Sequence, residues 1–272
     1  DGIRDFCLSR GLGDVYKRQM IKSLDRISYL TNSLEEAEKT FSAFFGAKPL
    51  KKVISKDRNY ESVIYGFENM NFEIIKKNDG LSEEDKLCGF SLLSDDLTGL
   101  NISTSYEEYE NNEESDNKTQ LIKSIDIKQS PDFQLSVNEY EELGMNRSND
   151  NNLFALDHLV LTTNKSDDLI NLYEKELGIR LALDQFVEKW GGRMLFFRTG
   201  HATIEVIDNK VEGSDQFWGL AWKTKDIRKK REYLVENGFN VTDVKDGRKK
   251  DTLVATVKFD EIKIPTLLVE HL

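Results

Sequence analysis

Leu156-Asp157-His158 and Thr203-Ile204-Glu205-Val206-Ile207 are second copies of segments that occur 132 positions earlier in the chain, and this repetition decides the fold. The first copies are Leu24-Asp25-Arg26 and Asn71-Phe72-Glu73-Ile74-Ile75, so both segments have one offset (156 − 24 and 205 − 73). The two copies therefore align without a gap between these segments. Self-similarity at a fixed spacing is typical of a repeated structural unit, so we predict two related domains.

Each copy predicts a strand, a helix and then a hairpin of two strands. The first strands, at 27–30 and 159–162, are rich in aliphatic, aromatic and β-branched residues. Ser33 and Glu36 have the spacing of a capping box, and Gly46 and Gly178 stand where a left-handed residue ends a helix. The expected hairpins pair 62–67 with 72–76 and 193–198 with 202–208. With a less distinct strand before each hairpin, the unit is β-α-β-β-β.

A further unit follows each of these, because 88–92 (Cys-Gly-Phe-Ser-Leu) corresponds to 218–222 (Trp-Gly-Leu-Ala-Trp). The later copy predicts a helix over 227–237 and a final hairpin of 252–259 with 263–270. In the earlier copy the helix region, 97–106, contains glycine and asparagine and runs into an acidic stretch, so this module is diverged. The prediction is therefore an α+β fold of four βαβββ modules in two pairs.

The domain boundaries follow from the limits of the repeat. Residues 1–19 lie outside it and resemble the read-through translation of a sequencing adapter, with a disordered native tail as the alternative, so Met20 is the expected start. We expect a diverged first domain over 20–144, a linker over 145–152 and a second domain over 153–272.

Composition excludes several classes of partner and function. With 38 Lys and Arg against 49 Asp and Glu, the formal net charge is −11, which repels nucleic acid and anionic membranes. There is no apolar run of the ~20 residues that span a bilayer and no secretory signal pattern, so we expect a cytoplasmic protein.

Cys7 and Cys88 are too few for a disulfide framework. Motifs for nucleotide binding, a nucleophile elbow and a zinc ribbon are missing from the sequence.

Paired β-α-β-β-β modules with a histidine on a first strand and a glutamate on a fourth strand resemble the vicinal oxygen chelate superfamily of glyoxalases, bleomycin-resistance proteins and extradiol dioxygenases. The resemblance covers 20–272 and is strongest at 156–160, at Gly191-Gly192 before 193–197, and at 247–250. It implies that each domain forms a half-open β-cup that binds a small molecule. In metal-dependent members, the first and fourth strands of each module carry the ligands.

In the second domain the resemblance places His158, Glu205 and Gly219 at three of these ligand positions. The fourth is Leu267 in an ungapped alignment, or Glu270 if the last hairpin loop is three residues longer, and we favour Glu270. His158, Glu205 and Glu270 would then be barely enough for a divalent metal ion.

In the first domain the corresponding residues are Arg26, Glu73 and Gly89. Arginine does not ligate a cation, so we predict no metal in the first domain and an ion pair between Arg26 and Glu73.

Strand alternation predicts that His158 and Glu205 both face the second cup. Three roles stay open for them: metal ligands, a metal-free acid and base pair, or a structural hydrogen-bonded pair. The expected substrate-binding residues are Trp190, Arg193, Gly219, Ala221 and Arg248. Gly219 and Ala221 either leave room for a ligand or allow close strand packing, and Arg193 and Arg248 can clamp a carboxylate or phosphate.

Other aromatic and histidine residues are expected to have no role in binding. Trp218 and Trp222 have the parity of core residues, and His201 and His271 are expected in solvent. For Glu270, the alternative to a metal ligand is a solvated residue near the chain end.

Two functions follow from these residues and the resemblance. The first is a glyoxalase-like or dioxygenase-like enzyme that acts on a small oxygenated molecule in the second cup, with His158 and Glu205 as ligands or as base and acid. The second is a cup that binds or sequesters a small molecule without catalysis, as bleomycin-resistance proteins do.

Overall fold

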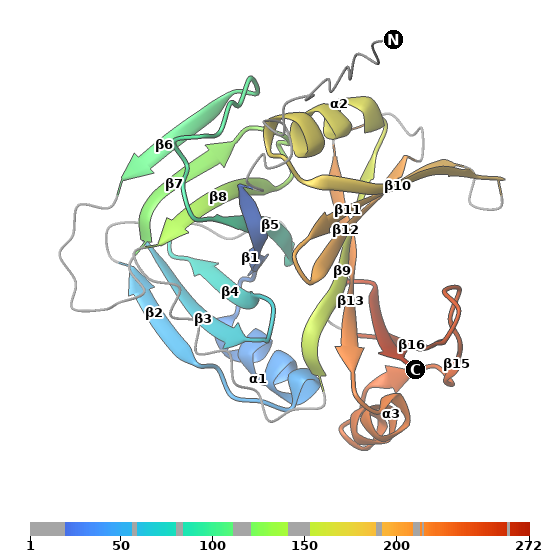
Figure 1. Cartoon of the computed structure of the whole chain (residues 1–272). Helices are drawn as coiled ribbons and strands as arrows, with labels where there is room; N and C mark the ends of the chain where they lie inside the picture. Colours follow the sequence, from blue (N-terminus) through green and yellow to red (C-terminus); the bar gives the residue numbers. More distant parts are fainter. Residues whose placement is uncertain are drawn as a thin grey trace, which may run out of the picture.

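The structure is a computed structural model that describes residues 20–55, 59–79, 84–110, 121–140, 153–188, 192–208, 213, 215–259 and 262–272. The leader over 1–19 with Cys7, the linker over 145–152, and Trp190 therefore lie outside the described residues. Two separate sheets form the molecule (Figure 1).

The first sheet has eight strands in the order β2-β3-β4-β1-β5-β8-β7-β6. Its elements are β1 (Ile21–Leu30), α1 (Leu34–Phe45), β2 (Lys51–Ser55), β3 (Tyr60–Gly66), β4 (Asn71–Lys77), β5 (Lys86–Ser94), β6 (Tyr106–Glu110), β7 (Leu121–Ile127) and β8 (Gln134–Tyr140). The first strands of the two modules, β1 and β5, pair antiparallel at the centre, and each pairs in parallel with the fourth strand of its own module.

The second sheet repeats this order as β10-β11-β12-β9-β13-β17-β16-β14, with β15 beside β16. Its elements are β9 (Leu153–Thr163), α2 (Ser166–Ile170), the π-helix η2 (Asn171–Glu176), β10 (Arg180–Val187), β11 (Gly192–Thr199), β12 (Ala202–Asp208), β13 (Gln216–Thr224), α3 (Ile227–Glu236), β14 (Asn240–Val241), β15 (Lys245–Asp246), β16 (Thr252–Lys258) and β17 (Thr266–His271). Neither sheet closes into a barrel, so the predicted α+β fold with two half-open cups is confirmed.

The predicted helix boundaries of the first module are confirmed in atomic detail. The Ser33 hydroxyl accepts a hydrogen bond from the Glu36 backbone N–H, and Gly46 ends α1 with a φ of 72°. Gly178, with a φ of 67°, follows η2 in the second domain. Residues 95–105 of the second module, all of them described, form bends and turns and no helix. The region that contains glycine and asparagine thus lacks the helix that the other modules have at this place.

The helices lie between the two sheets, and the two domains share one apolar core. Phe45 of α1 packs edge-on against Trp222 of β13, with 5.1 Å between the ring centroids. Nearby, the Lys230 ammonium of α3 donates to the carbonyl oxygen of Phe44 over 2.6 Å, and burial lowers the pKa of this lysine to about 7.

No helix among the described residues is long and apolar enough to cross a membrane.

Candidate functional site

The concave face of the second sheet brings His158 and Glu205 together. His158 on β9 pairs with Thr203 on β12, and Glu205 follows two residues later on the same face. His158 Nε2 lies 3.6 Å from Glu205 Oε2, which is longer than a hydrogen bond. The two side chains are 20% and 15% exposed. They are thus sheltered by the cup and accessible to a small molecule.

Asp157 joins this pair because β9 has a bulge at this residue. Ala221 of β13 pairs with His158 and Trp222 pairs with Leu156, so Asp157 has no residue opposite it. Its Oδ2 lies 2.8 Å from His158 Nδ1. A carboxylate at Nδ1 favours the tautomer with the proton on that nitrogen, which leaves the lone pair of Nε2 directed toward Glu205. The sequence prediction missed Asp157, because a bulge interrupts the alternation on which that prediction relied.

His271 is exposed, as expected from its place near the chain end, and it also contacts Asp157. Its Nε2 lies 2.7 Å from Asp157 Oδ1, and the Lys223 ammonium lies 3.7 Å from the same oxygen. His271 is the last residue of β17, so the sheet register carries it to the bulge. Only the tertiary pairing of β13 with β17 could have shown this.

The two carboxylates of the site differ electrostatically. Burial acts to raise the pKa of Asp157, but the hydrogen bonds from His158 and His271 outweigh it and hold this pKa well below its usual range. Burial raises the pKa of Glu205, and the nearby His158 and Arg248 act in the opposite direction. Asp157 is therefore a fixed anion behind the imidazole, whereas Glu205 is the carboxyl group more ready to hold a proton.

Glu270 does not lie with these residues, and the preferred alignment was wrong about it. In the parallel pairing of β13 with β17, Ala221 is opposite Leu267, so Leu267 takes the fourth-strand position that Glu205 has on β12. Glu270 accepts a hydrogen bond from the Ile227 backbone N–H at the start of α3 over 2.8 Å. Its carboxylate therefore caps a helix on the convex side of the sheet.

Several predicted substrate-binding residues have structural roles instead. Arg193 faces the helix side, where its guanidinium binds the Asp184 carboxylate through Nε and Nη2 and Asp167 through Nη1. A Cβ added at Gly219 would collide with the backbone oxygen of Pro265, so this glycine allows close strand packing. Ala221 is only 1% exposed and belongs to the floor of the sheet.

The described tryptophans also separate into two environments. Trp222 is buried as predicted, but Trp218 is 52% exposed. A bulge between Phe217 and Gly219 in the pairing with β9 removes Trp218 from the predicted alternation. Arg248 is exposed on the loop after β15, and its charge acts on Glu205, so it remains a candidate for contact with a ligand.

The residues present do not fit a metal site built by the protein. Of the four strand positions, His158 and Glu205 can ligate a metal, and Gly219 and Leu267 cannot. Among the described residues no group of three or more His, Cys, Asp and Glu side chains is arranged to hold a metal ion. Transition-metal sites generally have three or more protein ligands, so we assign no chemical step to a metal.

The first cup contains the predicted ion pair at the equivalent place. Arg26 Nη1 donates to Glu73 Oε2 over 2.7 Å, and the Ser62 hydroxyl donates to Glu73 Oε1 over 2.7 Å. The Glu73 side chain is 5% exposed. At the position where the second cup has His158, the first cup therefore has an arginine whose guanidinium binds the glutamate.

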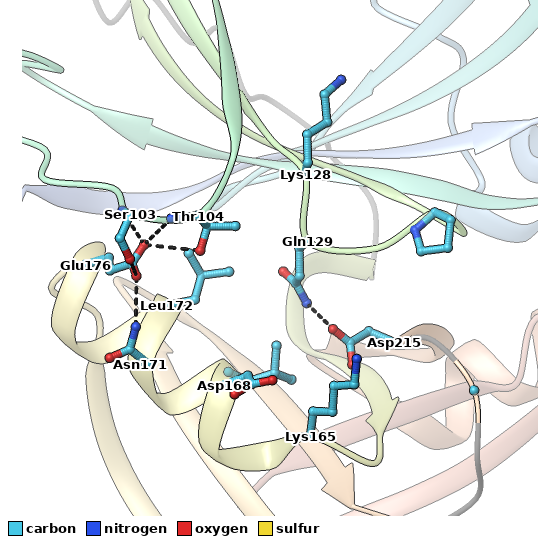
Figure 2. Close-up of a pocket in the computed structure, with 13 residues that line it drawn as sticks. Ser103, Thr104, Lys128, Gln129, Lys165, Asp168, Asn171, Leu172, Glu176 and Asp215 are labelled. Carbon is cyan, nitrogen blue, oxygen red and sulfur yellow. Dashed lines mark hydrogen bonds between the residues drawn. The ribbon is translucent and has the colours of Figure 1, made fainter.

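A cavity of about 400 Å³ lies outside both cups, between the first domain and the helix of α2 and η2. Figure 2 shows two of its carboxylates bound across the domain boundary. Glu176 accepts from the hydroxyl and backbone N–H of Ser103, and Asp215 accepts from the Gln129 amide over 3.1 Å. These contacts join the two domains.

The comparisons with known proteins agree with this architecture. Residues 157–256 match the family model of the glyoxalase/bleomycin resistance protein/dioxygenase superfamily. A mutant of 4-hydroxymandelate synthase from Streptomyces coelicolor has a similar structure, with a TM-score of 0.67, 12% identity and 92% of each chain covered. The Mn(II)-bound glyoxalase from Novosphingobium aromaticivorans has a TM-score of 0.62 and 11% identity, over 93% of this chain and 83% of the other. A halotolerant catechol dioxygenase has a TM-score of 0.61 and 10% identity, over 93% and 87%.

The chain thus has the two-domain fold shared by these synthases, glyoxalases and dioxygenases. The resemblance to the vicinal oxygen chelate superfamily is confirmed, and the second domain carries its sequence pattern. No match is found among curated proteins. Because one fold supports different reactions, the reaction has to be argued from the site.

Proposed function

We propose that the protein is an enzyme of the glyoxalase and dioxygenase type of fold that moves a proton on a small oxygenated molecule in the second cup, without a metal ion. The observation that carries this proposal is that Asp157 and Glu205 lie on either side of the His158 imidazole. Asp157 Oδ2 is 2.8 Å from Nδ1, and Glu205 Oε2 is 3.6 Å from Nε2. It has the parts that proton transfer needs: a base, a group that orients the base, and a proton donor beside it.

His158 is the base in this proposal. Asp157 holds the proton on Nδ1 and favours the imidazolium that forms when Nε2 takes a proton from a carbon next to a carbonyl group. The same carboxylate is bound by His271, so its orientation is fixed from two sides. The captured proton then returns to a neighbouring atom of the same molecule, and the net reaction is an isomerisation.

Glu205 is the proton donor. Its pKa is raised by burial, so a larger fraction of this carboxyl group is protonated near neutral pH than for a solvated glutamate. Since its Oε2 lies beside His158 Nε2, the two groups approach neighbouring atoms of one substrate: the C–H and the carbonyl oxygen. A protonated Glu205 donates to that oxygen as negative charge develops on it, and it regains a proton from a hydroxyl group of the intermediate when His158 returns the first proton to carbon.

Deuterium exchange tests this reaction with simple carbonyl compounds in place of the natural substrate. The protein is incubated in D2O with hydroxyacetone and with pyruvate, and exchange of the C–H next to the carbonyl group is followed by proton NMR. We expect exchange above the buffer rate that is lost in His158→Gln and insensitive to chelator. Exchange that disappears with chelator and returns with a divalent metal would instead support the metal-dependent form.

A second candidate function is binding or sequestration without turnover, which is favoured by Leu267 and Gly219 at positions where metal-dependent relatives have ligands. It predicts that both probes bind in the cup and that wild type and His158→Gln give the same exchange rate as buffer.

A further inference from the structure

We infer that the second cup is built for a carboxylate substrate, whose anionic group is held by Arg198. This inference rests on the proposed function, because it names the substrate class of the same site. Arg198 was not singled out in the sequence, since one arginine at the end of a strand carries no pattern of its own.

Arg198 belongs to the row of residues that crosses the concave face at His158. It pairs with Thr203 on β12, and Thr203 pairs with His158 on β9. Its Nη1 donates to the Thr203 hydroxyl over 2.9 Å, so the guanidinium leans along this row toward the imidazole. Within the part of the chain that the structure describes, Arg198 has no other partner, and its Nε and Nη2 form the edge that binds a carboxylate with two parallel hydrogen bonds.

Two further cations lie around the same residues. Lys223 is 3.7 Å from Asp157 and donates to the backbone oxygen of His201 over 3.1 Å. The charge of Arg248 acts on Glu205. Lys223 and Arg248 thus act on Asp157 and Glu205, and Arg198 lies in the same row as His158, in a protein whose net charge is −11. These cations favour an anionic ligand over a neutral one.

The first cup shows that this charge is not required by the fold. At the repeat positions of Arg198 and Lys223, the first domain has Gly66 and Leu93. Its own guanidinium, that of Arg26, is held by Glu73. The cations that surround His158 are therefore a property of the cup that keeps the acid and base pair.

The test compares pyruvate with pyruvamide, its neutral analogue, in saturation-transfer difference NMR titrations of the full chain. We expect pyruvate to bind and pyruvamide to bind much more weakly. Arg198→Gln should weaken the binding of pyruvate at least about tenfold, whereas the matched control Arg228→Gln, which removes the same charge from the exposed side of α3, should leave the affinity within about twofold. Both positions are exposed, so the variants should fold, and their thermal unfolding would check this.

The outcome of this test is separate from that of the proposed function. Equal binding of pyruvate and pyruvamide, or the same affinity in Arg198→Gln and Arg228→Gln, overturns the carboxylate assignment, while deuterium exchange that depends on His158 still supports the proposed proton transfer. Conversely, pyruvate binding that requires Arg198 but gives no exchange supports the assigned anion site and removes the proposed reaction.

Discussion

The two cups have the same bulge on their central strand, but the residues around it interact differently. In each, a bulge on the central strand turns an aspartate inward, and a glutamate follows on the fourth strand. In the first cup the residue after the aspartate is Arg26, and its 2.7 Å bond to Glu73 locks both charges. In the second it is His158, which stands 3.6 Å from Glu205 without a hydrogen bond. The residue after the aspartate thus decides whether the glutamate is held in an ion pair or is left without a hydrogen bond to its neighbour.

The partners of the two bulge aspartates differ in the same way. Asp25 accepts hydrogen bonds from Ser91, Asn138 and Tyr140, none of which titrates near neutral pH in this setting. Asp157 is bound by two histidines. The bulge is therefore common to both cups, and the groups that bind its aspartate differ between them.

The largest expected effect tests whether the second cup alone is active. His158→Gln should lower the rate of deuterium exchange by about 10²- to 10⁴-fold, because it removes the general base. The control is His201→Gln, which changes an exposed histidine in the turn after β11. Equal rates for these two variants would contradict the assignment of His158.

Breaking the ion pair tests the structural role of the first cup. Arg26→Met should reduce the free energy of unfolding in urea by about 3 kcal/mol, because it leaves the carboxylate of Glu73 buried without its partner. The double variant Arg26→Met with Glu73→Met should recover much of this loss. Additive effects of the two substitutions would show that the pair is not coupled.

The pH dependence of the free energy of unfolding at acid pH tests the role of Asp157. Its pKa is lowered in the folded state, so its contribution is complete above about pH 4, the ordinary pKa of an aspartate, and is lost as the pH falls toward the folded value. We expect wild type to exceed Asp157→Asn by about 2 kcal/mol at pH 7 and the gap to shrink below pH 4. Urea unfolding at several pH values measures it. A gap that is constant with pH would refute this linkage.

The smallest effect concerns Glu270, which separates a helix cap from a metal ligand. Glu270→Ala should cost about 1 kcal/mol of stability, because the Ile227 N–H at the start of α3 loses its acceptor. Glu270→Gln keeps an acceptor and should cost less. Neither should change deuterium exchange. A loss of exchange in Glu270→Gln at unchanged stability would return this residue to the site.

The sequence predicted the features that depend on local periodicity. The repeat predicted two related sheets, and strand alternation predicted that His158 and Glu205 face one cup, because alternation does not depend on the partner strand. It failed at Asp157 and Trp218, where bulges add a residue to one strand. The substrate-binding role expected for Arg193 was a different failure, because this residue alternates with Met194 on β11 and lies on the helix side, where two carboxylates bind it. Strand alternation in the sequence already indicates this face.

What the sequence by itself determined is therefore the duplicated α+β fold and the asymmetry between Arg26 and His158. The tertiary structure alone decided the register of β17, which places Leu267 rather than Glu270 beside the site, and the approach of His271, Lys223 and Arg248. The physical reason is that the register of a parallel strand pair is set by long-range hydrogen bonds and by the length of the connecting loop, and neither leaves a local pattern in the sequence.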